Sequence, residues 1–304
     1  MSNNVLITGG TGMVGTRLSE LLLAQGYTVS HLSRSPGDRS SPIITYLWDV
    51  KQHYINPEAL PRADYVIHLA GAGVADQRWT DERKQAILKS RTESTRLLHD
   101  VLAQQSPPSL KAFVSASAIG LYGTDTGDTV LTEESPAAHD FLAEVVTQWE
   151  AEVDTIQALG IRTVKYRIGI VLSEKGGALA PIARTVRWGV GAPLGSGQQY
   201  MSWIHLDDLC RLFIYALENE AIHGAYNAVG PQPITNRELT QAAARVLHRP
   251  LWLPRVPPFA LKLALGEMAS VALGGNRVSS QKIEDAGFAH KFNKIEVALA
   301  DLLK

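Results

Sequence analysis

The feature that most constrains this chain is a glycine-rich loop near its start. Residues 5–22, VLITGGTGMVGTRLSELL, predict a buried strand, a loop and an amphipathic helix in immediate succession. Gly9, Gly12 and Gly15 have the spacing G-x-x-G-x-x-G. The first glycine permits a tight turn, the second lets the backbone approach a pyrophosphate, and the third lets the helix pack on the strand. A glycine triplet alone is weak evidence, but in this context it predicts a dinucleotide-binding loop.

The residues after the second predicted strand indicate which dinucleotide is bound. An NAD site usually carries a carboxylate there for the ribose hydroxyls, whereas this chain has Ser33 and Arg34. A guanidinium suits a 2′-phosphate, and Ser33 or Ser35 could add a hydroxyl donor. Arg39 is a second candidate with less positional support. We therefore expect NADP(H) to be preferred over NAD(H); the alternative is that Arg34 is an ordinary solvated loop arginine.

Short apolar runs alternate with longer amphipathic segments through the first half of the chain. This alternation predicts an α/β fold, a Rossmann-type doubly wound parallel sheet with helices on both faces. From residue 173 the sequence becomes rich in glycine and then in proline. We expect residues 1–172 to form the NADP-binding domain, with returning segments near 200–230. Residues 173–199 and 231–304 are expected to form a small, mostly helical C-terminal substrate lobe.

The charge balance and the single cysteine exclude several classes of protein. A formal net charge of -1 leaves no electrostatic footprint for nucleic acid or for an anionic membrane. The most apolar late segment, residues 259–275, is interrupted by Lys262 and Glu267 and is too short to span a bilayer. Cys210 cannot form an internal disulfide, and we expect it to be a buried structural thiol. We therefore expect a cytoplasmic protein with no nucleic-acid partner and no membrane partner.

Several motifs together resemble the extended short-chain dehydrogenase/reductase family. They are the loop TGGTGMVG, the strand end VIHLAG, the segment SASAIGLYG, and GSGQQYMSWIHLDDL later in the chain. The stretch GAGVADQRWTDERKQAILKSR is closer still to a bacterial subgroup, the epimerase-family proteins of the YfcH type. That subgroup is described as atypical, with a good cofactor loop and a degraded catalytic set. The resemblance covers the chain from Val5 to about Gly230.

On the cofactor side, the resemblance implies specific roles. It assigns the phosphate loop to Thr8, Gly9, Gly12, Met13, Val14 and Gly15. It places Asp49 beside the adenine, and the backbone of Leu69, Ala70 and Gly71 beneath the nicotinamide ribose. It also places Arg167 in the strand that ends beside the nicotinamide.

The catalytic side departs from the family's pattern. The family uses a tyrosine as general acid/base, a lysine four residues on, and a serine or threonine that holds the substrate oxygen. Aligning Glu150 with the family's glutamate puts Leu142 at the tyrosine position and Val146 at the lysine position. Ala118 stands at the serine position, with Ser117 beside it. Because proton transfer normally contributes about 10²–10⁴-fold, we expect the usual mechanism to be severely impaired.

Three residues remain as candidates for the missing chemistry. Tyr122 lies just past the fifth predicted strand, Ser117 precedes it, and His205 is the residue type best suited to proton transfer near neutral pH. The alternative for Tyr122 is a packing tyrosine in a turn. For the pair Asp207 and Asp208 beside His205, it is helix N-capping by an aspartate. One histidine beside two aspartates lacks the spread of ligands that a zinc site needs, so we expect no metal.

The substrate side points away from nucleotide sugars. Met201 stands where family members that bind nucleotide sugars carry an arginine for the diphosphate, and Met201, Trp203, Trp79 and Trp188 are available to line an apolar pocket. We therefore favour an NADP(H)-dependent reductase or other oxidoreductase acting on an unidentified small apolar substrate. The alternative is a non-catalytic NADP(H) redox sensor, and the second alternative is a nucleotide-sugar epimerase or dehydratase.

The resemblance also bears on the oligomeric state. The family often dimerises through a bundle of helices that includes the one at residues 140–152. Val145 and Trp149 on that helix would suit a homodimer contact. A buried intramolecular face explains these two residues equally well.

Overall fold

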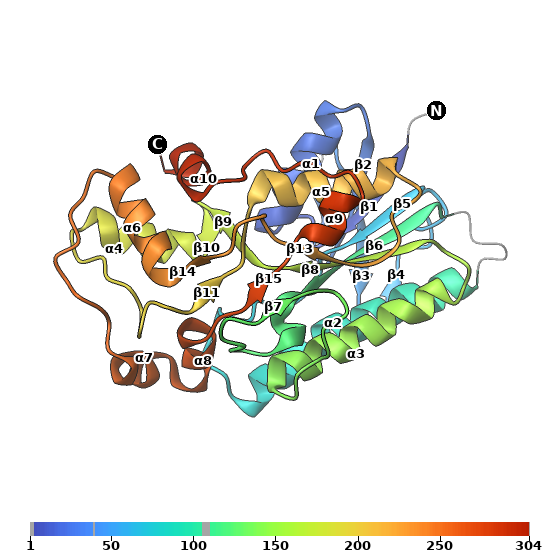
Figure 1. Cartoon of the computed structure of the whole chain (residues 1–304). Helices are drawn as coiled ribbons and strands as arrows, with labels where there is room; N and C mark the ends of the chain where they lie inside the picture. The colour runs from blue at the N-terminus through green and yellow to red at the C-terminus, as the bar shows by residue number, and fades with distance from the viewer. Residues whose placement is uncertain (1–2, 39, 105–109, 304) are drawn as a thin grey trace.

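The computed structural model describes residues 3–38, 40–104 and 110–303, and its centre is an eight-stranded sheet (Figure 1). The strand order is β13-β8-β6-β5-β1-β2-β3-β4. The strands are β1 (Asn4–Thr8), β2 (Thr28–Ser33), β3 (Ile44–Asp49), β4 (Tyr54–Ile55), β5 (Tyr65–His68), β6 (Ala112–Ala118), β8 (Thr163–Ile168) and β13 (Gly224–Ala228). All neighbouring pairs are parallel except β3 and β4. The order reverses between β1 and β5, which confirms the predicted Rossmann-type sheet.

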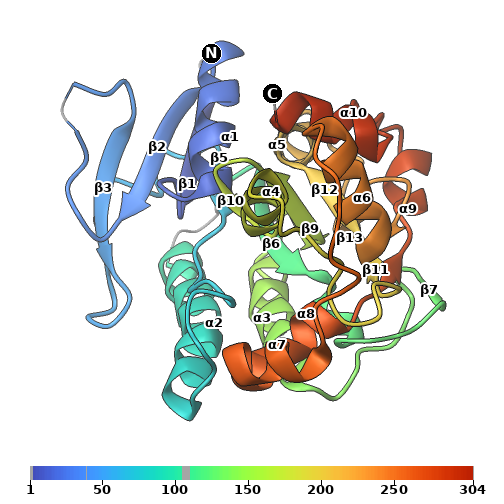
Figure 2. The ribbon, with the colours of Figure 1, turned by 90° about the vertical axis from the view of Figure 1, so that its left-hand side faces the viewer.

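Helices cover both faces of the sheet (Figures 1 and 2). One layer contains α1 (Met13–Ala24) and α5 (Leu206–Glu218), and the other contains α2 (Asp81–Ala103) and α3 (Phe141–Gln157). The two long helices begin where side chains accept a first-turn N–H group: Thr80 from Arg83 in α2, and Asp140 from Ala143 in α3. Because the central strands are buried on both faces, their sequences are continuous apolar runs rather than alternating ones.

Cys210 lies on the inner face of α5 and is fully buried. Burial raises the pKa of its thiol well above the usual range. This confirms the expected structural thiol. None of the helices in the described ranges combines the length and the apolar character needed to cross a membrane.

The later part of the chain forms most of a smaller lobe, at the left of Figure 1. Its elements are β9 (Ile170–Ser173), β10 (Gly176–Gly177), α4 (Leu179–Arg187), β11 (Tyr200–Met201), β12 (Trp203–His205), β14 (Ile234–Thr235), α6 (Asn236–Val246), α7 (Pro258–Leu265), α8 (Ala269–Leu273) and α10 (Ile295–Leu302). Leu172, Trp203, Leu239 and Phe292 belong to its own buried core.

One part of the late segment belongs with the sheet rather than with the lobe. The short helix α9 (Gln281–Asp285) packs beside β13, and Ile283 and Phe288 are buried in the core of the sheet. The sequence placed all of residues 231–304 in the lobe, because it gives no local signal for this return. A two-stranded ladder of β7 (Val130–Leu131) and β15 (Arg277–Val278) ties the same region to the end of β6.

Candidate functional site

The glycine loop lies at the carboxyl end of β1, at the point where the strand order reverses. Gly9 has a φ of 70°, in the left-handed region that favours glycine. A Cβ on Gly9 would lie 2.9 Å from the carbonyl carbon of Leu69, and a Cβ on Gly15 would lie 2.4 Å from the carbonyl oxygen of Gly9. No side chain of the described residues caps α1 at Gly12, so its first N–H groups are available to an anion. Glycines here make a close-fitting cradle that suits a pyrophosphate.

Thr8 links the glycine loop to the end of β5. Its hydroxyl is fully buried and lies 2.7 Å from Nδ1 of His68. It also accepts hydrogen bonds from the N–H groups of Leu69 and Ala70, both at 3.1 Å. The Thr8 hydroxyl therefore fixes the end of β5 beside the glycine loop, and the role of Thr8 in the phosphate loop remains a prediction. Because Leu69 and Ala70 are held in this way, their backbone lies directly beside Gly9.

The buried His68 makes the stability of the fold depend on pH. Burial, with a contribution from the charge of Arg91, lowers its pKa to about 3. Below about pH 6.5 the unfolded chain takes up a proton that the folded chain cannot bind. The free energy of unfolding should therefore fall by about 1.4 kcal/mol per pH unit as the pH decreases from 6.5 towards 3, through this residue alone.

The measurement is urea denaturation at pH 7.5 and at pH 5.5 for the native protein and for His68→Asn. The variant should show a weaker pH dependence, since it removes the group that titrates only after unfolding. His53→Asn is the matched control, because the side chain of His53 is 61% exposed. An equal pH dependence in the native protein and His68→Asn would contradict this role.

The predicted residues for the adenosine ribose lie at the same edge of the sheet. Leu32 on β2 pairs with Thr8 on β1, so Ser33 ends β2 beside the glycine loop. Arg34 follows and is exposed, which leaves its guanidinium available to a ligand. The second arginine candidate, Arg39, lies outside the described residues.

Asp49 ends β3 and is partly engaged in a turn. Its Oδ1 accepts hydrogen bonds from the N–H groups of Lys51 at 2.9 Å and Gln52 at 3.2 Å. One carboxylate oxygen therefore stabilises the β3–β4 connection. The predicted contact with adenine falls to its second oxygen and remains a prediction.

Arg167 is engaged by partners inside the protein, and its predicted place beside the cofactor remains a prediction. Its Nε and Nη2 donate to the two carboxylate oxygens of Glu150, both at 2.9 Å, and its Nη1 donates to the carbonyl oxygen of Glu133 at 3.0 Å. Both members of the Arg167–Glu150 pair are less than 9% exposed. The pair joins β8 to α3 inside the protein, because a buried guanidinium needs a buried carboxylate.

Ser117 and Tyr122 belong to the same buried network, and their catalytic roles remain predictions. Ser117 donates to Oε1 of Glu150 at 2.6 Å. The hydroxyl of Tyr122 donates to Oδ1 of Asn227 at 2.7 Å and accepts from Arg167 at 3.1 Å. Both side chains are 3% exposed, and burial raises the pKa of Tyr122. The burial, the raised pKa and the two partners favour the alternative interpretation, a tyrosine that packs in the turn.

His205 makes structural contacts, which favour the helix-capping alternative, and its catalytic role remains a prediction. Its Nδ1 accepts the N–H of Asp207 at 3.0 Å, so the histidine itself caps α5. Its ring stacks on Phe292 with centroids 3.7 Å apart, and its Nε2 lies 3.3 Å from Asp301 of α10. These contacts hold the C-terminal segment of the chain against α5, and burial lowers the histidine pKa.

The position expected for catalysis is apolar. A Cβ on Gly120, just after β6, would lie 3.4 Å from the Cβ of Leu142 and 3.9 Å from Cγ2 of Val146. Helix α3, on which the family carries its tyrosine and lysine, therefore lies beside the end of β6 as expected. It turns two aliphatic side chains, Leu142 and Val146, towards that end. Phe141, at the start of the same helix, packs edge-on against Trp79 at a centroid distance of 5.0 Å.

The other predicted pocket residues lie elsewhere. Met201 and Trp203 are buried in the core of the lobe, and the indole N–H of Trp203 donates to the carbonyl oxygen of Gln232. Trp188, at the end of α4, is 73% exposed. Val145 and Trp149 are buried within the chain itself and do not present a surface to a second copy. Of the residues predicted to line an apolar pocket, only Trp79 lies near the altered helix.

The lobe is tied to the start of α2. Nε and Nη2 of Arg78 donate to the carbonyl oxygens of Ala264 and Leu263 at the end of α7, both at 2.9 Å. Lys84 and Glu267 form an ion pair at 2.7 Å.

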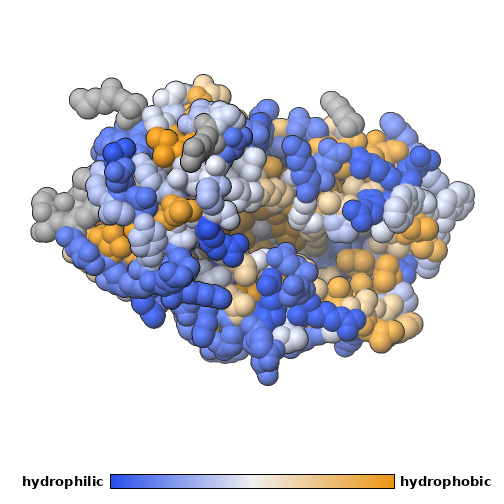
Figure 3. Space-filling view, turned by 180° about the vertical axis from the view of Figure 1, so that it is seen from behind, coloured by the Kyte–Doolittle hydropathy of each residue, from blue (hydrophilic) through white to orange (hydrophobic). Residues whose placement is uncertain are grey.

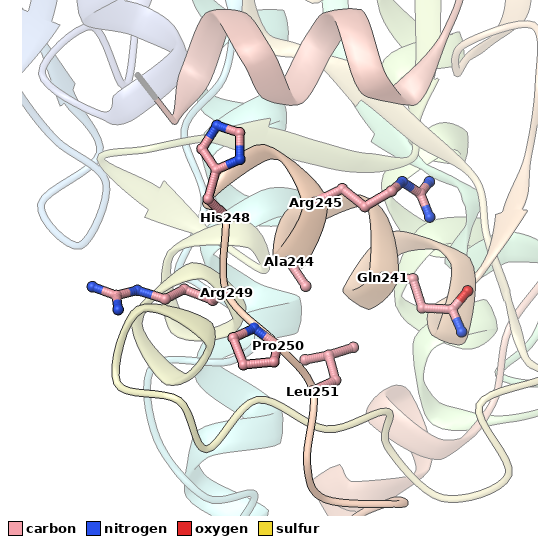
Figure 4. Close-up of a pocket in the computed structure, with 7 residues that line it drawn as sticks. All are labelled: Gln241, Ala244, Arg245, His248, Arg249, Pro250 and Leu251. Atoms are coloured by element: carbon pink, nitrogen blue, oxygen red, sulfur yellow. The ribbon is translucent and has the colours of Figure 1, made fainter.

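Seen from behind, the molecule is hollowed at its centre and apolar residues gather in the hollow (Figure 3). A separate surface pocket of about 580 Å³ lies at the end of α6 (Figure 4). The residues in that pocket are Gln241, Ala244, Arg245, His248, Arg249, Pro250 and Leu251.

A glycine cradle at the reversal point of a doubly wound sheet, followed by an altered catalytic helix, defines an atypical protein of the short-chain dehydrogenase/reductase class. Comparison with known proteins identifies the family. The chain belongs to the NAD dependent epimerase/dehydratase family, whose model matches residues 5–229. A second model, described as a domain of unknown function (DUF1731), matches residues 256–302.

The relatives are similar over the whole chain. The epimerase family protein YfhF of Bacillus subtilis is 37% identical over 300 residues, which are 99% of this chain and 98% of that protein. The structure of human epimerase family protein SDR39U1 (isoform 2) with NADPH superposes with a TM-score of 0.87 at 31% identity, covering 98% of each chain. A nucleoside-diphosphate sugar epimerase of Corynebacterium glutamicum gives a TM-score of 0.80 at 30% identity, and covers 100% of this chain and 58% of that one.

Proposed function

We propose that this protein binds NADP(H) in preference to NAD(H) and is an oxidoreductase for a small, largely apolar substrate. The observation that carries the proposal is an intact cofactor cradle beside an apolar catalytic position. The glycine loop fits a pyrophosphate closely, whereas Leu142 and Val146 occupy the places of the proton donor and its lysine. The exposed Arg34 supports the preference for a 2′-phosphate, as does the NADPH named for the human relative.

The residues of the chain would bind and orient the reactants. The first N–H groups of α1 would hold the phosphates, and the segment after β5 would support the cofactor from the side. NADPH, when bound, supplies the hydride, so the reaction does not require a redox-active side chain. Phe141, Leu142 and Trp79 would give the substrate an apolar wall near the end of β6. Since neither Leu142 nor Val146 can donate a proton, the proton comes from water and turnover is slow.

Two other functions have specific support. A redox sensor would also retain the cradle and lose the proton donor, and would bind NADPH tightly without turnover. A nucleotide-sugar epimerase or dehydratase agrees with the name of the family and of the Corynebacterium relative. Met201 argues against it, because it stands where family members that bind nucleotide sugars carry an arginine, and a buried methionine cannot supply that charge to a diphosphate.

The test is the oxidation of NADPH by purified protein in the presence of small apolar aldehydes and ketones, followed by the loss of NADPH absorbance. Slow oxidation that depends on both protein and substrate would support an oxidoreductase. Tight NADPH binding without oxidation across the panel would favour the sensor. Absence of NADPH binding would exclude both.

A further inference from the structure

Two arginines near the start of α2 bracket the segment that follows β5. Nη1 of Arg91 donates to the carbonyl oxygen of Ala72 at 3.0 Å and to that of Ile87 at 2.9 Å. About two helical turns earlier in α2, Nη2 of Arg83 donates to the carbonyl oxygen of Gly73. Both arginines therefore hold the backbone of residues 72–73, just beyond the stretch that lies beside Gly9.

The guanidinium of Arg91 lies between two helices and directly against a glycine. Its Cζ is 5.2 Å from the ring centroid of Trp149 on α3, which is 5% exposed. On the other side, a Cβ on Gly71 would lie 3.1 Å from the same Cζ. Gly71 is exposed. Because Gly71 has no side chain, no Cβ occupies the space beside the guanidinium there. Figure 2 shows α2 and α3 side by side in this part of the molecule.

The positive charge of this pair is poorly compensated. Within the described parts of the chain, no carboxylate lies within salt-bridge distance of Arg91, and the one beside Arg83 is Asp76 at 3.4 Å, whose side chain is 69% exposed. Nε of Arg83 is buried without a hydrogen-bond partner. Burial, together with the charge of Arg83, lowers the pKa of Arg91 to about 10. Two partly buried cations near each other are costly unless an anion joins them.

We propose that Arg91 and Arg83 form an anion subsite at the edge of the cofactor cleft, which takes a phosphate or a carboxylate group. The planar donor fork of arginine suits both groups. The subsite lies beyond the end of β5, and ligands of a doubly wound sheet bind outside the carboxyl ends of the strands near the reversal point. The inference rests on the proposed function and deepens it: the anion belongs either to the pyrophosphate of the cofactor or to a substrate that combines an acidic group with an apolar body.

The experiment uses inorganic phosphate as the probe and Arg91→Gln as the variant. Phosphate affinity is measured by titration calorimetry at constant ionic strength, on the free protein and on its complex with saturating NADPH. Arg96→Gln is the matched control, because Arg96 lies on the same helix with its side chain 58% exposed and pairs with Glu152. Arg91→Gln should weaken phosphate binding by about tenfold or more, whereas Arg96→Gln should change it by less than about twofold.

The titrations with NADPH distinguish the two possible sources of the anion, the cofactor and the substrate. If the subsite holds the cofactor pyrophosphate, Arg91→Gln weakens NADPH about tenfold and leaves adenosine 2′,5′-bisphosphate unchanged. In that case saturating NADPH also displaces phosphate. If the subsite serves the substrate, NADPH affinity stays within about twofold, and phosphate binding to the NADPH complex is lost in the variant. Either result supports the subsite.

A folded Arg91→Gln variant that binds phosphate and NADPH as Arg96→Gln does would overturn the proposal. If Arg91→Gln does not fold, Arg91→Lys and Arg83→Gln replace it, since lysine keeps the charge but lacks the fork. Asp76→Asn should strengthen phosphate binding, because it removes the carboxylate that competes for Arg83. The phosphate titration of the free protein needs no nucleotide, so it tests the subsite even if NADPH does not bind.

Discussion

Replacing Glu150 with glutamine should lower the free energy of unfolding by about 3–5 kcal/mol. Glu150 accepts two hydrogen bonds from Arg167 and one from Ser117, and its Oε2 lies 3.8 Å from Nζ of Lys165. Although burial alone would raise the pKa of Glu150, the hydrogen bonds and charge of Arg167 outweigh it, and the pKa lies below its usual value. The carboxylate is therefore ionised, and removing its charge leaves the buried Arg167 without a counter-ion.

The measurement is urea denaturation at neutral pH, with Glu152→Gln as the control. Glu152 lies on the same helix but pairs at the surface with Arg96, and losing such a pair costs less than about 1 kcal/mol. The double variant Glu150→Gln/Arg167→Met should recover part of the loss, because both buried charges are then removed. Equal effects of Glu150→Gln and Glu152→Gln would show that the buried network contributes little to stability.

Replacing Gly15 with alanine should abolish measurable NADPH binding, a loss of at least about 100-fold. The new Cβ would lie 2.4 Å from the carbonyl oxygen of Gly9 and 2.6 Å from the Cα of Gly10, so α1 must move away from the loop. That movement displaces the N–H groups that would hold the pyrophosphate. Crowding of backbone against backbone should also lower the free energy of unfolding by about 1–3 kcal/mol.

Gly26→Ala is the control for this substitution. Gly26 has a φ of 84°, and no atom lies within 4 Å of the position of its Cβ. Alanine there should cost about 1–2 kcal/mol through the left-handed backbone alone, and should leave NADPH affinity unchanged. Calorimetry on both variants separates loss of stability from loss of the site. Normal NADPH binding by a folded Gly15→Ala variant would show that the loop is not the cofactor site.

The fold could be predicted from the sequence because its signals are local. The strand, glycine loop and helix at the start of the chain are contiguous, and the alternation of apolar runs with amphipathic segments indicates parallel pairing. Strand alternation also places Arg167 and Lys165 on one face of β8 and Tyr166 on the other. The structure agrees, since the Tyr166 hydroxyl donates to the carbonyl oxygen of Leu212 while both cations face α3.

The candidate site was harder to predict, because the partners of its side chains lie far away in the sequence. Nothing near Tyr122 in the sequence indicates that its hydroxyl meets Asn227, and nothing near His205 indicates the ring of Phe292. One signal was available: Arg167 lies in an apolar strand, and a buried arginine requires a carboxylate such as Glu150. The same reasoning applies to Arg91, which stands on a charged helix and looked like an ordinary surface residue.

The central claim is that the glycine cradle with Arg34 is an NADP(H) site. The most direct test is a calorimetric titration of the purified protein with NADPH and with NADH, repeated on Arg34→Ala. We predict one NADPH site per chain, weaker binding of NADH, and a selective loss of NADPH affinity of about tenfold or more in the variant. Absence of binding to either nucleotide, or equal affinities that Arg34→Ala leaves unchanged, would contradict the claim.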